Sequence, residues 1–200
     1  MTGRRPDRPA SAGRNELIAA ARALFAELGY AGTSTRQIAA AAGMQPGNLR
    51  HHFVSKAGLF TAVYEDCIAQ VSAVVAPMVD GGTGVAPGDI VRRLGQLAAA
   101  APGVAAFLAV APLERSRHRE LQSELGEEPV VLEHLVRASV GHWAAAGRVA
   151  PGVDTDALVD ALIAAVYGVL LYSTRIDPTV DRTASFEALA LMVDGSAWAR

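Results

Sequence analysis

The sequence predicts an all-α fold of about nine helices. Apolar residues recur at intervals of three and four along most of the chain, which is typical of helices with one buried face. The sequence does not show the alternating pattern of a half-buried strand, and Gly and Pro separate the helical segments. With 51% hydrophobic residues among 200, the chain can bury a substantial core, as one large domain or two smaller ones.

The N-terminal segment is predicted to be an arm followed by one helix. Residues 1–13 hold two Pro and little apolar content, so we expect a flexible basic arm. An apolar stripe with helical spacing follows, formed by Leu17, Ala21, Leu24, Phe25 and Leu28. This stripe predicts a first helix over residues 14–28, which Gly29 ends.

A short helix, a tight turn and another short helix come next. Ser34 and Gln37 have the spacing of a capping box, which predicts a second helix that ends just before the turn-forming Gly43. Pro46 suits the first position of a third helix, which runs to about residue 52. This order of elements is that of a helix-turn-helix, a motif that reads DNA.

Gly and Pro divide the rest of the chain into further helices. Ser55 is the expected N-cap of a fourth helix, and Asp154 that of a helix that is apolar on nearly every side and needs cover on several faces. A loop is expected over residues 77–88 and a turn over residues 147–152. The expected helices cover residues 55–76, 88–100, 103–110, 112–125, 128–146, 155–175 and 183–197.

Charge is distributed unevenly along the chain. In residues 1–60, eight basic residues against three acidic ones give a net charge of +5. The whole chain carries −2, so residues 61–200 carry −7. A cationic end suits the phosphates of DNA, and an acidic remainder does not. The charge therefore supports the helix-turn-helix independently of its spacing.

The third predicted helix has one apolar face, formed by Leu49 and Phe53, which can pack on the domain core. Its other side chains then face away, as a helix in the major groove requires, although solvated surface polarity would give the same composition. Arg50 can hold the guanine edge with two bonds, and Asn48 can bond a base or a phosphate. The candidates for DNA contact on this segment are Gln45, Pro46, Gly47, Asn48, Arg50, His51 and His52.

Two basic residues lie at unusual helix positions. Arg36 and Lys56 each fall in the first turn of a predicted helix. A cation there is unfavourable by ~0.3–1 kcal/mol, because that end of the helix dipole is positive. A DNA phosphate would relieve both, and the hydroxyl of Thr35 can donate to the same phosphate.

The stretch GTSTRQIAAAAGMQPGNLRHHFVSKAGLFTAVYE closely resembles the N-terminal domain of TetR-family transcriptional regulators. The resemblance runs from about Asn15 to Asp66 and is marked by LFAELGYAGTS, the IA…AG pair, and HHF followed by SK. It implies a helix-turn-helix DNA-binding domain over residues 14–60 and a helical ligand-binding and dimerisation domain over residues 61–200. Members of the family are mostly repressors that a small ligand releases from DNA.

The resemblance also implies roles for single residues. It puts Thr35 and Arg36 where the second helix contacts the backbone or a base, and Lys56 at a phosphate clamp. The residues it puts on the helix in the major groove are Pro46, Gly47, Asn48, Arg50, His51 and His52. The family usually has Tyr where this chain has Arg50, which can keep a phosphate contact or read guanine.

The C-terminal domain is expected to hold a lipophilic or aromatic effector and to form a homodimer. The helices over residues 155–175 and 183–197 are the expected dimer pair, because a two-fold DNA reader needs two copies; a monomer's central helix is the alternative. Apolar, aromatic and Met side chains fill cores as readily as they line pockets. The candidate pocket residues are Cys67, Val71, Met78, Phe107, Leu108, His134, Trp143 and Tyr167.

An enzyme is a weaker interpretation. His134 and His142 lie about 12 Å apart along a helix at ~1.5 Å per residue, too far to share one metal. Glu114 and His118 are four apart, but the Arg residues around them favour a solvated salt-bridge face. The sequence carries no phosphate-binding loop or nucleophile motif. We expect no catalytic residues, no metal and no cofactor.

A second alternative is a helical ligand-binding or interaction protein whose helix-turn-helix is only structural, or an activator with the same fold. The basic arm, Arg36, Arg50 and Lys56 favour DNA binding over a structural role.

The expected location is the cytoplasm, without membrane contact. The apolar runs over residues 97–111 and 157–172 are short or broken by Pro and Gly, and the N-terminus lacks an apolar signal core. The single cysteine, Cys67, excludes an internal disulfide. Its apolar surroundings predict a small buried residue, with a redox sensor as the alternative.

Overall fold

The computed structural model describes residues 10–80, 85–125, 131–177 and 179–195. Within these ranges it holds ten α-helices, one π-helical turn and no strand, so the predicted all-α class is confirmed. The helices are α1 (Ala10–Gly32), α2 (Thr35–Ala41), α3 (Pro46–His52), α4 (Lys56–Asp80), α5 (Pro87–Ala100), α6 (Pro102–Arg117), α7 (Arg119–Leu125), α8 (Val131–Ala145), α9 (Thr155–Leu171) with the π turn η1 (Tyr172–Ile176), and α10 (Arg182–Val193).

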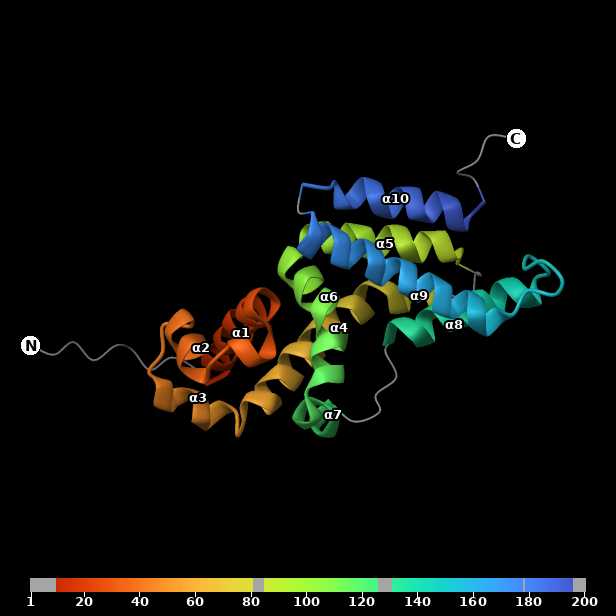
Figure 1. Ribbon diagram of the computed structural model, residues 1–200. Helices are drawn as coiled ribbons and strands as arrows, with labels where there is room; N and C mark the ends of the chain where they lie inside the picture. Colours follow the sequence, from red (N-terminus) through yellow and green to blue (C-terminus); the bar gives the residue numbers. More distant parts are fainter. Residues whose placement is uncertain (1–9, 81–84, 126–130, 178, 196–200) are drawn as a thin grey trace, which may run out of the picture.

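The first three helices gather at one end of the molecule (Figure 1). We call α1, α2 and α3 the head. Helix α4 leads away from the head to a bundle in which α5, α8, α9 and α10 lie together (Figure 1). Helix α6 packs on α1 and also on α9, so it touches both the head and the bundle.

Two apolar cores hold these parts. The first joins the head to α4, α6 and α7, and its centre is a row of rings in which Phe60 lies 5.1 Å from both Phe25 and Phe107. The second lies inside the bundle, between α4, α5, α6, α8, α9 and α10. Helix α6 links the two cores, because it contributes Phe107 to the first and Ala109 to the second, while Leu108 packs against both.

The first helix begins earlier than predicted. Residues 10–13 are helical, so the expected arm is wrong over its last four residues; the rest of it lies outside the described ranges. Residues 10–32 hold no Pro that would break the helix. Gly13 is buried, and a Cβ added there would lie 3.1 Å from the Met44 side chain and 3.4 Å from Nε2 of His52 in α3. The predicted end at Gly29 is a kink, with φ 72° and ψ 173°, after which one more turn follows.

The local signals of the second and third helices are confirmed. The backbone amide of Gln37 donates to Ser34 Oγ at 3.2 Å, and the backbone amide of Ser34 donates to Gln37 Oε1 at 2.9 Å. These two bonds complete the capping box. Gly43 has φ 67°, the left-handed conformation that a tight turn needs. Pro46 occupies the first position of α3.

Two Pro residues that were predicted to end helices lie inside them instead. Helix α4 continues through Pro77, so the loop predicted over residues 77–88 is wrong at its start, and residues 81–84 lie outside the described ranges. Helix α6 runs through Pro112 and ends at Arg117 instead, with His118 as its C-cap. Pro112 itself is exposed while Ala109 and Ala111 beside it are buried, so burial of the flanking residues outweighs the lost backbone bond.

The C-terminal elements follow the prediction more closely. Asp154 accepts from the amides of Asp156 and Ala157 and so caps α9, and the turn after α8 contains Gly147 and Gly152, both with positive φ. The last expected helix ends at Val193 rather than residue 197, a position outside the described ranges.

Two helices have the length and composition of membrane spans, namely Lys56–Met78 and Thr155–Ile176. The expectation that no segment would qualify is therefore wrong, because it counted only unbroken apolar runs, whereas a long apolar helix can include one or two charged residues and still qualify. Both helices pack within the fold: α4 lies against α1, α5 and α8, and α9 lies against α6, α8 and α10.

Candidate nucleic-acid interface and effector cavity

The helix-turn-helix is fixed by three buried side chains on its inner face. Ile38 of α2 is fully buried, Leu49 of α3 is 2% exposed, and Phe53 after α3 is 7% exposed. All three belong to the first core with Phe25, as predicted for the back of a recognition helix. The outer faces of α2 and α3 are thereby turned to solvent.

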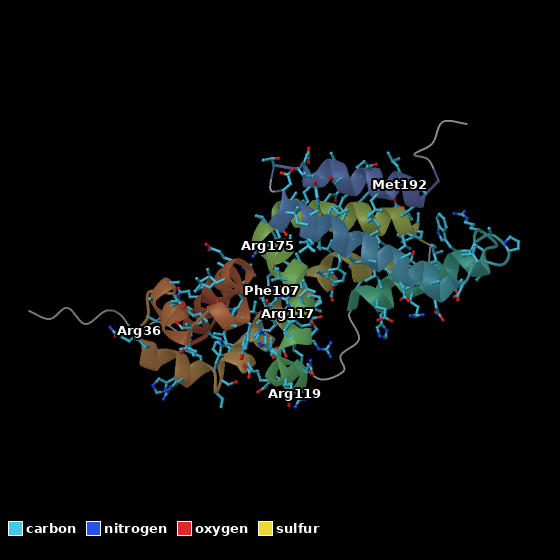
Figure 2. All side chains as sticks on the ribbon, in the orientation of Figure 1. Arg36, Phe107, Arg117, Arg119, Arg175 and Met192 are labelled. Atoms are coloured by element: carbon cyan, nitrogen blue, oxygen red, sulfur yellow. The ribbon has the colours of Figure 1, made fainter. Side chains whose placement is uncertain are left out.

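Most of the predicted DNA-contact residues lie on this outer surface. The exposed ones are Thr35, Arg36, Gln45, Pro46, Gly47, Asn48, Arg50 and His51. Figure 2 shows Arg36 projecting at the outer end of the head, away from the bundle. No atom lies within 4 Å of a Cβ added at Gly47, so the start of α3 is open to a neighbouring backbone. We call this set the reading surface.

His52 lies at the border of the reading surface. It is only partly exposed, and its Nε2 would lie 3.4 Å from a Cβ added at Gly13 of α1. Its ring centroid is 6.5 Å from that of Phe53. His52 therefore helps to pack α3 on α1 as well as facing the surface.

Lys56 is turned toward the head. Its Nζ donates to the carbonyl oxygens of Tyr30 at 2.8 Å and Thr33 at 3.1 Å, and lies 4.0 Å from the centroid of the Tyr30 ring. Burial lowers its pKa, while the nearby carboxylates of Glu120 and Glu114 oppose that shift. An ammonium has three donors, so two hold the end of α1 and one is left for another acceptor.

The other basic residues of the N-terminal segment are used in different ways. Arg22 donates to Asp66 at 2.9 Å and ties α1 to α4. The Arg14 guanidinium lies over the Phe53 ring at 5.2 Å. Arg4, Arg5 and Arg8 lie outside the described residues. The net charge of the segment therefore overstates the charge of the reading surface, to which Arg36 and Arg50 contribute directly.

The bundle contains an apolar cavity of about 40 Å³. Its walls come from α4, α5, α6, α9 and α10 and are almost wholly aliphatic or aromatic. The lining residues are Ile68, Val71, Leu94, Leu97, Ala98, Val104, Ala105, Leu108, Val166, Tyr167, Leu170 and Phe186. Burial raises the pKa of Tyr167 to about 12, so its hydroxyl stays a neutral donor.

Three of the eight predicted pocket residues line this cavity: Val71, Leu108 and Tyr167. Cys67 and Phe107 lie in the first core instead, and Met78 borders an open groove between α4 and α5. His134 is exposed on α8, and Trp143, also on α8, lies beside Arg148. The prediction missed the contributions of α5 and α10, whose apolar stripes looked like ordinary core.

Cys67 is fully buried, and burial raises the pKa of its thiol to about 12. A thiol that keeps its proton is a poor nucleophile, so this position matches the expected small buried residue better than a redox sensor.

The candidate acid–base pair of the enzyme interpretation does come together. His118 Nε2 lies 3.4 Å from Glu114 Oε2, but the same carboxylate oxygen accepts a hydrogen bond from the backbone of Tyr30. Among the residues that the structure describes, no three His, Cys, Asp or Glu side chains are grouped as a metal site.

The sequence model described as "Bacterial regulatory proteins, tetR family" matches residues 17–63, the segment that builds the reading surface. The head is a TetR-family DNA-binding domain. The chain is a DNA-binding transcriptional regulator. The transcriptional repressor AcnR of Corynebacterium glutamicum is 37% identical over 70 residues, which span 35% of this chain and 37% of AcnR.

Likeness to known regulators extends beyond the head. The transcriptional regulator UidR of Escherichia coli K12 is 26% identical over 183 residues, 91% of each chain. The fold of the fatty acid degradation regulator FadR from Bacillus halodurans matches with a TM-score of 0.78 at 20% identity, covering 98% of this chain and 100% of FadR. At that identity the match shows the fold alone.

Proposed function

We propose that this TetR-family regulator is a homodimeric repressor that holds a near-palindromic operator and releases it when a small lipophilic or aromatic effector enters the bundle. The observation that carries the proposal is the pairing, in one chain, of a solvent-facing reading surface with an apolar cavity. We place the protein in the cytoplasm, where a regulator reaches bacterial DNA.

The outer faces of α9 and α10 support the dimer. Small residues line one exposed face of α9 at helical spacing, namely Ala157, Ala161, Ala164 and Gly168. The exposed face of α10 carries Ala184, Ala188 and Met192, and Met192 is 53% exposed (Figure 2). Because small side chains let two helices approach closely, two copies of these faces can pack around a two-fold axis. That symmetry matches an operator with two half-sites.

The cavity supports an apolar effector and explains how it would act. A volume of about 40 Å³ is several-fold smaller than the ~300–1,000 Å³ of pockets that hold small ligands. An effector can therefore bind only if the surrounding helices move apart. Its affinity then differs between the two arrangements, which is the condition for a ligand to shift one toward the other. Tyr167 offers one polar contact in an otherwise apolar lining.

Selection of bound duplexes from a random library by the purified full-length protein tests the proposal. The expected result is one enriched sequence with two inverted half-sites, centred about one helical turn of ~10 base pairs apart or a multiple of it. Enrichment of a single, asymmetric site would contradict the dimer, and the absence of any enriched sequence would contradict operator binding.

A further inference from the structure

We infer that Glu114 and Arg175 are positioning residues that fix the orientation of the head on the bundle. Both hold the C-terminal end of α1, and both extend from helices that line the cavity. The inference rests on the proposed function and adds the contacts through which movement in the bundle would reach the reading surface.

Glu114 of α6 holds α1 at its kink. Its Oε2 accepts a hydrogen bond from the backbone amide of Tyr30 at 2.9 Å. Gly29 allows this approach, because an added Cβ there would lie 3.1 Å from Glu114 Oε1 and its φ of 72° disfavours other residues. The Glu114 side chain is only 13% exposed, so water competes weakly for the bond.

Arg175 holds the same end of α1 from the other helix. Its Nη2 donates to the carbonyl oxygen of Glu27 at 3.2 Å, between residues 148 positions apart in the chain. Figure 2 shows Arg175 at the end of α9 that faces the head. Arg175 belongs to the π turn η1, and such turns are frequent at functional sites because they re-aim the side chains that follow.

Both contacts lie close to the cavity along their own helices. Leu108 lines the cavity, and Glu114 follows six residues later, about 9 Å along α6 at ~1.5 Å per residue. Leu170 lines it on α9, and Arg175 follows five residues later. Both segments stay helical over these distances, α6 through Pro112 and α9 into the π turn η1. Separation of α6 and α9 by an effector would therefore strain these two bonds.

A third contact on the same end of α1 comes from Lys56, whose helix α4 starts beside the head. Lys56 is part of the DNA-binding half and does not line the cavity. Lys56 ties the N-terminal end of α4 to the end of α1, whereas Glu114 and Arg175 tie that end of α1 to α6 and to η1.

Operator spacing tests this inference without a known effector. The affinity of the full-length protein is measured for the selected operator and for the same duplex with one base pair inserted between its half-sites. The insertion rotates the half-sites by roughly 35°, since one turn holds ~10 base pairs. The variants are Glu114→Ala, Arg175→Ala and the double change. Glu114→Gln keeps an acceptor for the Tyr30 amide, and the exposed Glu65 and Arg117, changed to Ala, are the matched controls.

We expect the wild type, Glu114→Gln and both controls to prefer the original spacing by about tenfold or more, a typical size for coupling between sites. The double variant should lose most of that preference, to about threefold or less, because freed heads adapt to both spacings. An unchanged preference in the double variant overturns the inference. Partial unfolding lowers binding to both duplexes alike and leaves the ratio as it was.

Amide hydrogen exchange at Tyr30 gives a second, independent measurement. Glu114→Ala should speed exchange of this amide about tenfold or more relative to the wild type, while amides in α5 keep their protection. Equal exchange in both proteins overturns the role of Glu114. If the library selection yields no operator at all, the proposed function fails, and the exchange measurement still decides whether the contact exists.

Discussion

Gly95 of α5 lies directly against Phe186 of α10, and its substitution by Ala tests the packing of the bundle. A Cβ added at Gly95 would lie 2.5 Å from the Cβ of Phe186 and 2.8 Å from its Cγ. The Phe186 Cβ is attached directly to the backbone of α10, so no side-chain rotation can move it away. Either α10 shifts outward or the two helices stay compressed.

The expected loss follows from two opposing effects. Overpacking of a well-packed core costs about 1–3 kcal/mol. Replacing Gly by Ala inside a helix contributes about 1 kcal/mol in the other direction. We therefore expect Gly95→Ala to lower the free energy of unfolding by up to about 2 kcal/mol. For a chain of this size that lowers Tm by up to roughly 8 °C.

Gly141 provides the matched control. It lies inside α8, is exposed, and has no atom within 4 Å of an added Cβ. Gly141→Ala adds the higher helix propensity of Ala without a steric clash, so the Tm of this variant should rise by roughly 2–4 °C. Thermal unfolding followed by circular dichroism, at one protein concentration for all variants, measures both. A Gly95→Ala protein as stable as Gly141→Ala would refute the close contact between α5 and α10.

Three further predictions concern DNA, the thiol and the dimer. Asn48→Ala and Arg50→Ala should each change sequence preference at one operator position by about 1–3 kcal/mol, whereas Lys56→Ala should weaken binding to all sequences, as competition binding to single-base operator variants would reveal. Because its raised pKa keeps Cys67 protonated at pH 8, Ellman's reagent should react with it only after denaturation; rapid reaction of the native protein would contradict its burial. Gly168→Leu places a bulky side chain on the exposed face of α9 and should halve the mass measured by light scattering; an unchanged mass would exclude that face from the dimer.

The parts of the fold that could be predicted are those set by short-range chemistry. The capping box of Ser34 and Gln37 and the positive φ of Gly43 depend on residues within one turn, so the sequence alone places α2, the turn and α3. Pro112 shows the limit of such rules. Its effect on α6 depends on how much apolar surface its neighbours bury, which is a property of the whole fold.

The site was predictable to a similar extent. The exposed face of α3 follows from the positions of Leu49 and Phe53 within one short helix. Lys56 could not be placed in this way, because its two acceptors are carbonyl groups at the far end of α1, 23 and 26 residues away. The cavity was located only in part, because an apolar stripe reads the same in the sequence whether it packs tightly or leaves space.

The central claim is that the reading surface of α2 and α3 binds a specific DNA sequence. Fluorescence anisotropy with labelled DNA from upstream of the protein's own gene, and a scrambled duplex of the same composition, tests it most directly across a salt series. We expect binding to the upstream DNA at least about a hundredfold tighter than to the scrambled duplex, with a ratio that survives physiological salt. Equal, weak and equally salt-dependent binding to both duplexes, and to every duplex recovered by library selection, would contradict the claim.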